Sequence, residues 1–218
     1  TALGIIKCLK DVEYINIIGT DVQKYAAGSI FCDKFYCIFP ISDIESYKKE
    51  ILEIVAYEEI DIIFPTLQDE IMIYQEFNKD LGTEVAIPLS DTPDLLIDKE
   101  KLYKFLEKKN LIEYVPKYYA FNNNAELLNI VEKYFNNEKY VCVKTVQGHG
   151  GLGFAILTDR KNYIEALYKG KDKVYDLQDY CEVNSSNRRL VMEYLDGIEY
   201  SVDILLHQNK VIAVLPRR

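Results

Sequence analysis

The 218-residue sequence lacks three features that would each point to a particular class of protein. No apolar run approaches the ~18 residues of a membrane-spanning helix, and no signal-peptide pattern opens the chain. Lysine and arginine form no cluster, and the formal net charge is -9. We therefore expect binding neither to nucleic acid nor to an anionic membrane surface. Any phosphate site has to be local and built from a few residues.

The cysteines also lack a pattern. Their number is five, they lie far apart, and no C-x-x-C spacing occurs, so neither a disulfide framework nor a zinc site is indicated. A reducing cytoplasm is the simplest location for such a chain. What is present is an ordinary globular balance, with 49% hydrophobic and 28% charged residues, which suffices for one large domain or two small ones.

Helix and strand patterns alternate in the first part of the chain. Apolar residues at helical spacing predict helices over 1–10, 44–55 and 68–78, the second capped by Ser42 or Asp43. Short buried strands are predicted at 14–19, 35–39, 61–65 and 84–88. Residues 1–92 are thus expected to form an open parallel βαβ domain that lacks its first strand. Both ends of the chain look cut.

The pattern changes after a polar hinge at 90–94. A helix is predicted from Asp98, followed by strands at 117–121, 139–145 and 154–157 and a helix at 125–135. Further strands are predicted at 189–194, 200–206 and 210–215, the last two joined by a turn at Gln208-Asn209. We expect residues 93–218 to form a second, α+β domain, with an antiparallel lid at about 115–195 followed by the start of another subdomain.

The segment 141–154, VCVKTVQGHGGLGF, contains the spacing G-x-G-x-x-G. A dinucleotide-binding turn is excluded because a strand, not a helix, follows the glycines. A P-loop would end in Gly-Lys-Ser/Thr, and a protein kinase would need later H-R-D and D-F-G motifs, which are absent. Two interpretations remain: a glycine flap preceded by Lys144, or an ordinary hairpin in which the glycines only supply positive φ.

Four segments in a fixed order favour the flap. They are Asp98-Lys99 at a helix start, Val143-Lys144 on a strand, the glycine segment, and LVMEYLDGIEYSVD at 190–203. Together they resemble the ATP-grasp superfamily. The preceding domain and the motif EYSVD are most similar to its carbamoyl-phosphate-synthetase-like and pyrrolysine-biosynthesis-ligase-like branches. Residues 1–92 resemble the domain that precedes the ATP-grasp fold.

The resemblance implies a nucleotide site. Lys99 and Lys144 would bind phosphates, for which compact ammonium groups are suited. The flap glycines would offer backbone N–H groups to phosphate oxygens, and His149 would contact phosphate or remain a mobile loop side chain. Glu193, Tyr194 and Leu195 would bind the adenine, and Glu199 would bind the ribose hydroxyls. The flap residues implied are Gly148, His149, Gly150, Gly151 and Gly153. Without the other motifs, a solvated helix lysine is the favoured interpretation of Lys99, and Glu193 and Glu199 could simply face solvent.

The activity implied is that of an ATP-dependent carboxylate–amine ligase acting through an acyl phosphate, with an amino acid among the candidate carboxylates. The alternatives are phosphorylation of bicarbonate or carbamate, and a nucleotide-binding module without turnover. Arg217 is a candidate for offsetting transition-state charge. The ligands for Mg2+ are expected beyond Arg218, so the chain as given is expected to bind ATP weakly and to be inactive. A homodimer is left open.

Overall fold

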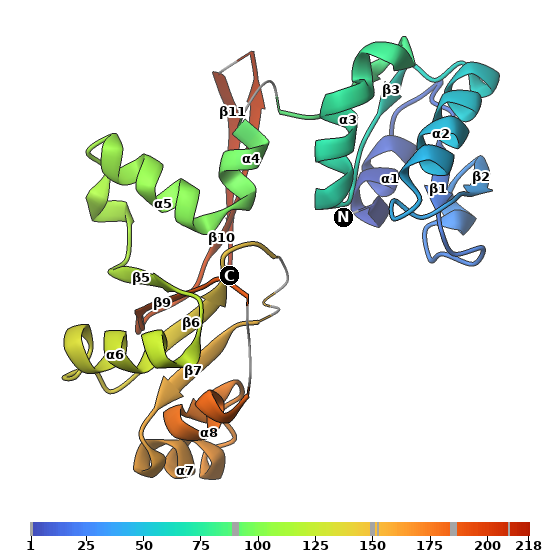
Figure 1. The fold of residues 1–218 in the computed structure, drawn as a ribbon. Helices are drawn as coiled ribbons and strands as arrows, with labels where there is room; N and C mark the ends of the chain where they lie inside the picture. The colour runs from blue at the N-terminus through green and yellow to red at the C-terminus, as the bar shows by residue number, and fades with distance from the viewer. Residues whose placement is uncertain (1, 89–91, 149–150, 152, 184–186, 209) are drawn as a thin grey trace. The chain divides into compact units, whose positions relative to one another are not determined.

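The computed structural model describes residues 2–88, 92–148, 151, 153–183, 187–208 and 210–218 (Figure 1). The chain divides into an amino-terminal unit, Thr1–Ile97, and a carboxy-terminal unit, Asp98–Arg218. The division falls five residues later than the boundary expected after residue 92, because helix α4 (Thr92–Ile97) packs against α3 (Gln68–Leu81) of the first unit.

The amino-terminal unit alternates helices with short parallel strand pairs. Strand β1 (Ile18–Asp21) pairs with β2 (Lys34–Cys37), and β3 (Ile62–Ile63) pairs with β4 (Glu84–Val85). The parallel direction agrees with the prediction, but the strands form two separate two-stranded sheets instead of one open sheet. The remaining elements of the unit are α1 (Ala2–Lys10), the 3-10 helix η1 (Ser29–Phe31) and α2 (Ile44–Glu58).

The first strand begins later than the sequence predicts. The apolar run starting at Tyr14 was expected to be extended, but Tyr14 has a φ of 65° and is fully exposed, and β1 begins only at Ile18. A residue in the left-handed region cannot continue a strand ladder. Ile17 instead donates its backbone N–H to the Asp33 carboxylate at 2.8 Å.

A hydrophobic core joins the two long helices of this unit. Tyr47 and Ile51 of α2 and Tyr74 and Phe77 of α3 are each less than 5% exposed. Asp43 caps α2, its carboxylate accepting the Ser46 N–H at 3.3 Å, which settles the choice between Ser42 and Asp43. The unit therefore has its own core and its own helix caps.

The carboxy-terminal unit is built on a five-stranded sheet of order β5-β9-β6-β7-β8. All neighbouring strands are antiparallel except β7 and β8. The strands are β5 (Tyr118–Phe121), β6 (Val141–Thr145), β7 (Ala155–Thr158), β8 (Val174–Asp176) and β9 (Arg189–Glu193). The helices are α5 (Lys99–Lys108), the 3-10 helix η2 (Ile112–Tyr114), α6 (Asn124–Tyr134), α7 (Arg160–Tyr168) and α8 (Leu177–Glu182).

The two faces of this sheet have different neighbours. Val143 and Val191 point to one face, where they pack with Leu127 of α6 and with side chains of α8. Because side chains alternate along a strand, Lys144 points to the other face. Tyr118 of β5 lies on that second face, and its ring centroid is 5.0 Å from that of Tyr103 on α5. Helix α5 therefore approaches the face that carries Lys144.

A separate hairpin ends the described chain. Strands β10 (Ser201–His207) and β11 (Lys210–Arg217) pair antiparallel, with an irregularity between Leu205 and Leu206. Their apolar side chains are exposed on both faces, as the values of 54% for Ile204 and 59% for Leu205 show. Among the helices in the described ranges, none is both long and apolar enough to cross a membrane.

Candidate functional site

The glycine segment connects β6 to β7 as a hairpin, and its backbone demands glycine. Gly148, Gly151 and Gly153 have φ values of 131°, 72° and 70°. A Cβ on Gly153 would lie 2.5 Å from Cγ2 of Thr145, closer than any real side chain allows. His149 and Gly150, which the sequence also places in the flap, lie outside the described residues. At Gly153 the loop passes so close to Thr145 that no side chain fits between them.

Lys99 is held at the first position of α5. The helix begins there because the Asp98 carboxylate accepts the Lys101 N–H at 2.9 Å. The backbone N–H of Lys99, one of the donors that a helix start leaves without a partner in the helix, donates to the Val146 carbonyl at 3.0 Å. Its Nζ donates to the Gly148 carbonyl at 3.0 Å. The fold thus brings the helix start to the flap, 49 residues further along the chain.

The electrostatics of Lys99 mark this place as unusual. Burial lowers the pKa of Lys99, the nearby Lys144 ammonium lowers that pKa further, and Asp98 partly offsets both effects. Lys144 comes from the second face of β6, and its Nζ lies 5.6 Å from the ring centroid of Phe154. Two ammonium groups close enough to disturb each other favour an anion between or beside them.

A third ammonium group, which the sequence motifs did not single out, reaches the same flap. The Nζ of Lys173 lies 5.9 Å from the Phe154 ring centroid, and a Cβ on Gly151 would come within 3.0 Å of that Nζ. Lys173 itself has a φ of 59°, uncommon for a residue with a side chain. The segment 169–173 reads as a polar loop, and nothing in its sequence indicates that its last lysine points at the glycines.

The residues expected to read adenine lie at the far end of β9. Glu193 ends the strand, accepts the Lys117 N–H on its carboxylate at 2.8 Å and donates its own N–H to the Lys117 carbonyl at 3.0 Å. Tyr194 follows, its ring 5.5 Å from that of Tyr140, beside a hollow of about 410 Å³ that both side chains line. Leu195 is 68% exposed.

The remaining predicted residues lie beyond β9. Glu199 is exposed in the connection to β10. Arg217, on β11, is paired with the Asp203 carboxylate of β10, with Nε to Oδ2 at 2.6 Å and Nη2 to Oδ1 at 3.0 Å. This pairing raises the pKa of Arg217. The structure therefore brings together Lys99, Lys144 and the described flap glycines, and engages Arg217 within its own hairpin.

A sequence comparison with known families finds a similarity in the amino-terminal part of the chain. Residues 4–87 match the family model of the PylC-like N-terminal domain. No curated protein matches the chain in a sequence search.

Solved structures match the fold at low sequence identity. N5-carboxyaminoimidazole synthetase from Staphylococcus aureus is similar with a TM-score of 0.60 and 13% identity, over 99% of this chain and 51% of the other. The corresponding ribonucleotide synthetase from Thermotoga maritima gives a TM-score of 0.56 and 16% identity, again over 99% and 51%.

A third similar structure carries ligands. It is the biotin carboxylase domain of the 2-oxoglutarate carboxylase from Hydrogenobacter thermophilus, solved with MgADP, ADP and bicarbonate, at a TM-score of 0.55 and 15% identity over 89% of this chain and 42% of the other. The chain thus spans about half the length of these structures or less. The match at residues 4–87 and these shared folds confirm the predicted mixed α/β fold: residues 4–87 are similar to a PylC-like N-terminal domain, and the chain shares the fold of these synthetases and of the biotin carboxylase domain.

Proposed function

We propose that the chain is the nucleotide-binding part of an ATP-dependent ligase. One observation carries the proposal: Lys99 and Lys144 converge at the base of a glycine hairpin, where the pKa of Lys99 is lowered by burial and by the Lys144 ammonium. Two neighbouring ammonium groups gain free energy when a phosphate group arrives. Glycine-rich loops beside such a pair commonly bind phosphate, because their backbone N–H groups can point at the phosphate oxygens.

The sheet offers a path for the rest of the nucleotide. Lys144 pairs with Leu190, and Glu193 stands three residues further along β9, which corresponds to ~10 Å along an extended strand. With the phosphates at Lys99, Lys144 and the flap glycines, the adenine would lie near Glu193, Tyr194 and Leu195. The Glu199 carboxylate would accept hydrogen bonds from the ribose hydroxyls.

The reaction we propose has two steps. A carboxylate oxygen of the substrate attacks the γ-phosphorus of ATP, so that ADP leaves and an acyl phosphate forms. An amine then attacks the acyl carbon, phosphate leaves, and a C–N bond remains. We propose an amino acid as the carboxylate, in line with the PylC-like match at residues 4–87. The competing substrate is bicarbonate, which the similar biotin carboxylase domain contains together with MgADP.

The described residues offer no site for magnesium. In this part of the chain, no three side chains of His, Cys, Asp or Glu gather in a way that could hold a metal ion. These residues alone do not fit the ion that usually accompanies ATP. A catalytic part for Arg217 would require its guanidinium to leave Asp203.

The test is a thermal shift. ATP with Mg2+ should raise the melting temperature of the intact protein by mass action, equivalent to about 2.7 kcal/mol at a ligand concentration 100 times the Kd. Lys144→Ala should abolish the shift. Lys133→Ala is the matched control, because Lys133 is an exposed lysine of α6, the helix that covers the opposite face of the sheet from Lys144, and should leave the shift unchanged. A wild-type protein that shows no shift would refute nucleotide binding.

Turnover separates the ligase from a module that only binds. Phosphate release from ATP would be followed while amino acids, and separately bicarbonate, are added with and without an amine. Release that needs an amino acid supports the ligase, and release with bicarbonate supports the alternative substrate. A protein that shows the thermal shift but releases no phosphate with any of these compounds is a nucleotide-binding module.

A further inference from the structure

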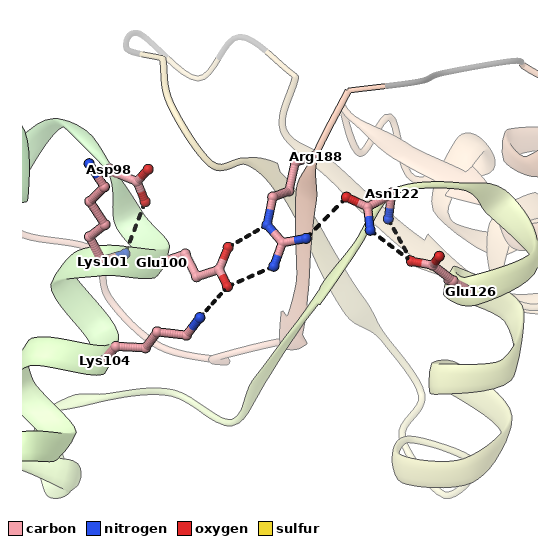
Figure 2. Close-up of polar contacts among 7 residues, drawn as sticks. All are labelled: Asp98, Glu100, Lys101, Lys104, Asn122, Glu126 and Arg188. Carbon is pink, nitrogen blue, oxygen red and sulfur yellow. Dashed lines mark hydrogen bonds and ion pairs between the residues drawn. The ribbon is translucent and has the colours of Figure 1, made fainter.

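A network of charged and polar side chains ties the start of α5 to the lid sheet (Figure 2). Glu100 accepts two hydrogen bonds from the Arg188 guanidinium, Nε to Oε2 at 2.6 Å and Nη2 to Oε1 at 2.8 Å. Lys104 Nζ donates to the same carboxylate at 2.6 Å. Arg188 also donates from Nη1 to Oδ1 of Asn122 at 3.0 Å, and the Asn122 amide contacts Glu126 at the start of α6. Arg188, just before β9, thus connects helix α5 with the start of helix α6.

The centre of this network is protected from water. The Glu100 side chain is 10% exposed, whereas that of Arg188 is 46% exposed. The Arg188 guanidinium, followed by the Lys104 ammonium, lowers the pKa of Glu100 to about 2 against the opposing effect of burial. A bidentate arginine–carboxylate pair fixes direction as well as distance. The pair is therefore a rigid joint between α5 and the residue before β9.

The joint acts on the neighbouring residue, Lys99. Consecutive residues of an α-helix point about 100° apart around the axis. Lys99 and Glu100 therefore lie in the same helical turn but contact different partners. Lys99 contacts the flap through Gly148, and Glu100 contacts the sheet through Arg188. A rotation or shift of α5 that breaks the second contact must displace the first.

The site needs such a restraint when no nucleotide is present. Repulsion between the Lys99 and Lys144 ammonium groups favours their separation, and helix α5 would provide the easiest movement. The backbone N–H of Lys99 anchors the helix start at the Val146 carbonyl but does not set the position of the ammonium group. That group has only a long contact of 3.5 Å to the Val146 carbonyl and a contact to Gly148, which belongs to an exposed glycine loop. The Glu100–Arg188 pair does not depend on the flap at all.

We infer that Glu100 and Arg188 are positioning residues, which hold Lys99 at the flap and opposite Lys144 before nucleotide binds. The nucleotide as ligand rests on the proposed function, whereas the placement of Lys99 does not. Preorganisation of this kind improves binding because the protein has already met the cost of ordering the site. Neither residue would touch the nucleotide.

The placement is tested without any ligand. Lysines of the full chain are reductively methylated with 13C-formaldehyde, the Lys99 signal is assigned with Lys99→Arg, and its pKa is measured by NMR titration. In the wild type this pKa should lie below that of an ordinary lysine. Glu100→Gln and Arg188→Met should move it back toward the ordinary value, and Arg188→Lys should do so partly, since an ammonium cannot form the bidentate pair.

The matched control is the other arginine–carboxylate pair of the lid, Arg160 with Asp179, whose side chains are 61% and 58% exposed. Arg160→Met should leave the Lys99 pKa unchanged. The inference is overturned if Glu100→Gln and Arg188→Met lower the melting temperature but leave the Lys99 pKa at its wild-type value. Should Glu100→Gln not fold, the two Arg188 variants decide, because that side chain is half exposed.

Affinity provides the second measurement. Titration with ATP and Mg2+ should give a Kd about 2- to 30-fold weaker in Glu100→Gln and Arg188→Met than in the wild type, the range expected when a network next to a site is cut. An unchanged Kd overturns the inference. A wild type that binds no nucleotide refutes the proposed function, and the NMR titration then decides alone on the placement of Lys99.

Discussion

Gly153 is the residue at which the flap is most sensitive to substitution. Its φ of 70° and the 2.5 Å approach of a built Cβ to Thr145 act together. Gly153→Ala should therefore lower the free energy of unfolding by about 1–2 kcal/mol for the left-handed backbone and by about 1–3 kcal/mol more for the clash. Urea denaturation followed by circular dichroism measures the sum.

A second glycine separates these two contributions. Gly170 has a similar φ of 65°, but a Cβ there would meet nothing within 4 Å. Gly170→Ala should thus show only the backbone term. Equal decreases in the free energy of unfolding for the two variants would show that Thr145 moves aside without cost. The clash at Gly153 would then not contribute to stability.

As a nucleotide site these residues stay a prediction, but part of their geometry follows from the sequence. The closeness of Lys99, Lys144 and the flap glycines could be predicted because glycine spacing and neighbouring motifs restrict the backbone. Lys173 and Arg188 could not, because their roles depend on a left-handed lysine and on a pairing across 88 residues. Most lysines and arginines lie on the surface, and no sequence periodicity indicates which of them forms an ion pair or approaches a loop.

Helix α5 is the element whose attachment depends on charge. Glu100, in its first turn, has a pKa of about 2, against 4.5 for an unperturbed glutamate, mainly because of Arg188. A carboxyl group with a lowered pKa in the folded state contributes stability above its unfolded pKa and loses it as the pH falls toward the folded value. The contribution of Glu100 should therefore be complete above about pH 4.5 and vanish toward pH 2.

This predicts a pH-dependent difference between two proteins. Urea denaturation at several pH values should show wild-type stability falling more steeply than that of Glu100→Gln between pH 4.5 and about 2, with the two curves converging at the acid end. Glu132→Gln is the control, because Glu132 is an exposed glutamate of α6, and it should leave the wild-type curve unchanged. Parallel curves for wild type and Glu100→Gln would contradict the lowered pKa.

Most elements follow from local patterns, and the exceptions have physical reasons. Helices α2, α3 and α6 were predictable because apolar residues recur at three- and four-residue steps. Strand β8 and helix α8 were missed, since the run from Lys171 to Glu182 is largely polar and only Val174 and Asp176 are buried there. Strand β1 was placed too early, because the left-handed backbone of Tyr14 cannot be read from an apolar run.

At the scale of the molecule, the two units carry separate hydrophobic cores. One centres on Ile51 and Phe77, the other on Leu127 and Val191. Lys99, Lys144 and the described flap glycines all belong to the carboxy-terminal unit. Calorimetry should therefore resolve two unfolding transitions, and ATP with Mg2+ should raise only one of them, because a ligand stabilises the unit that binds it.

Core substitutions assign the transitions. Leu127→Ala, at a fully buried position of the carboxy-terminal unit, should lower the ATP-sensitive transition by a destabilisation of about 2–5 kcal/mol. Ile51→Ala, in the amino-terminal unit, should lower the other one. If both variants shift a single transition that ATP also raises, the units unfold as one cooperative body.

The hydrogen bond from Lys99 to the Gly148 carbonyl has a consequence for any anion that enters the site. An ammonium group carries three N–H donors, so Lys99 can keep the Gly148 carbonyl while another N–H donates to a phosphate oxygen. The bond to the charged acceptor is the stronger of the two. One side chain would then hold the loop and its ligand together, so that motion of the glycine hairpin is transmitted directly to the bound anion.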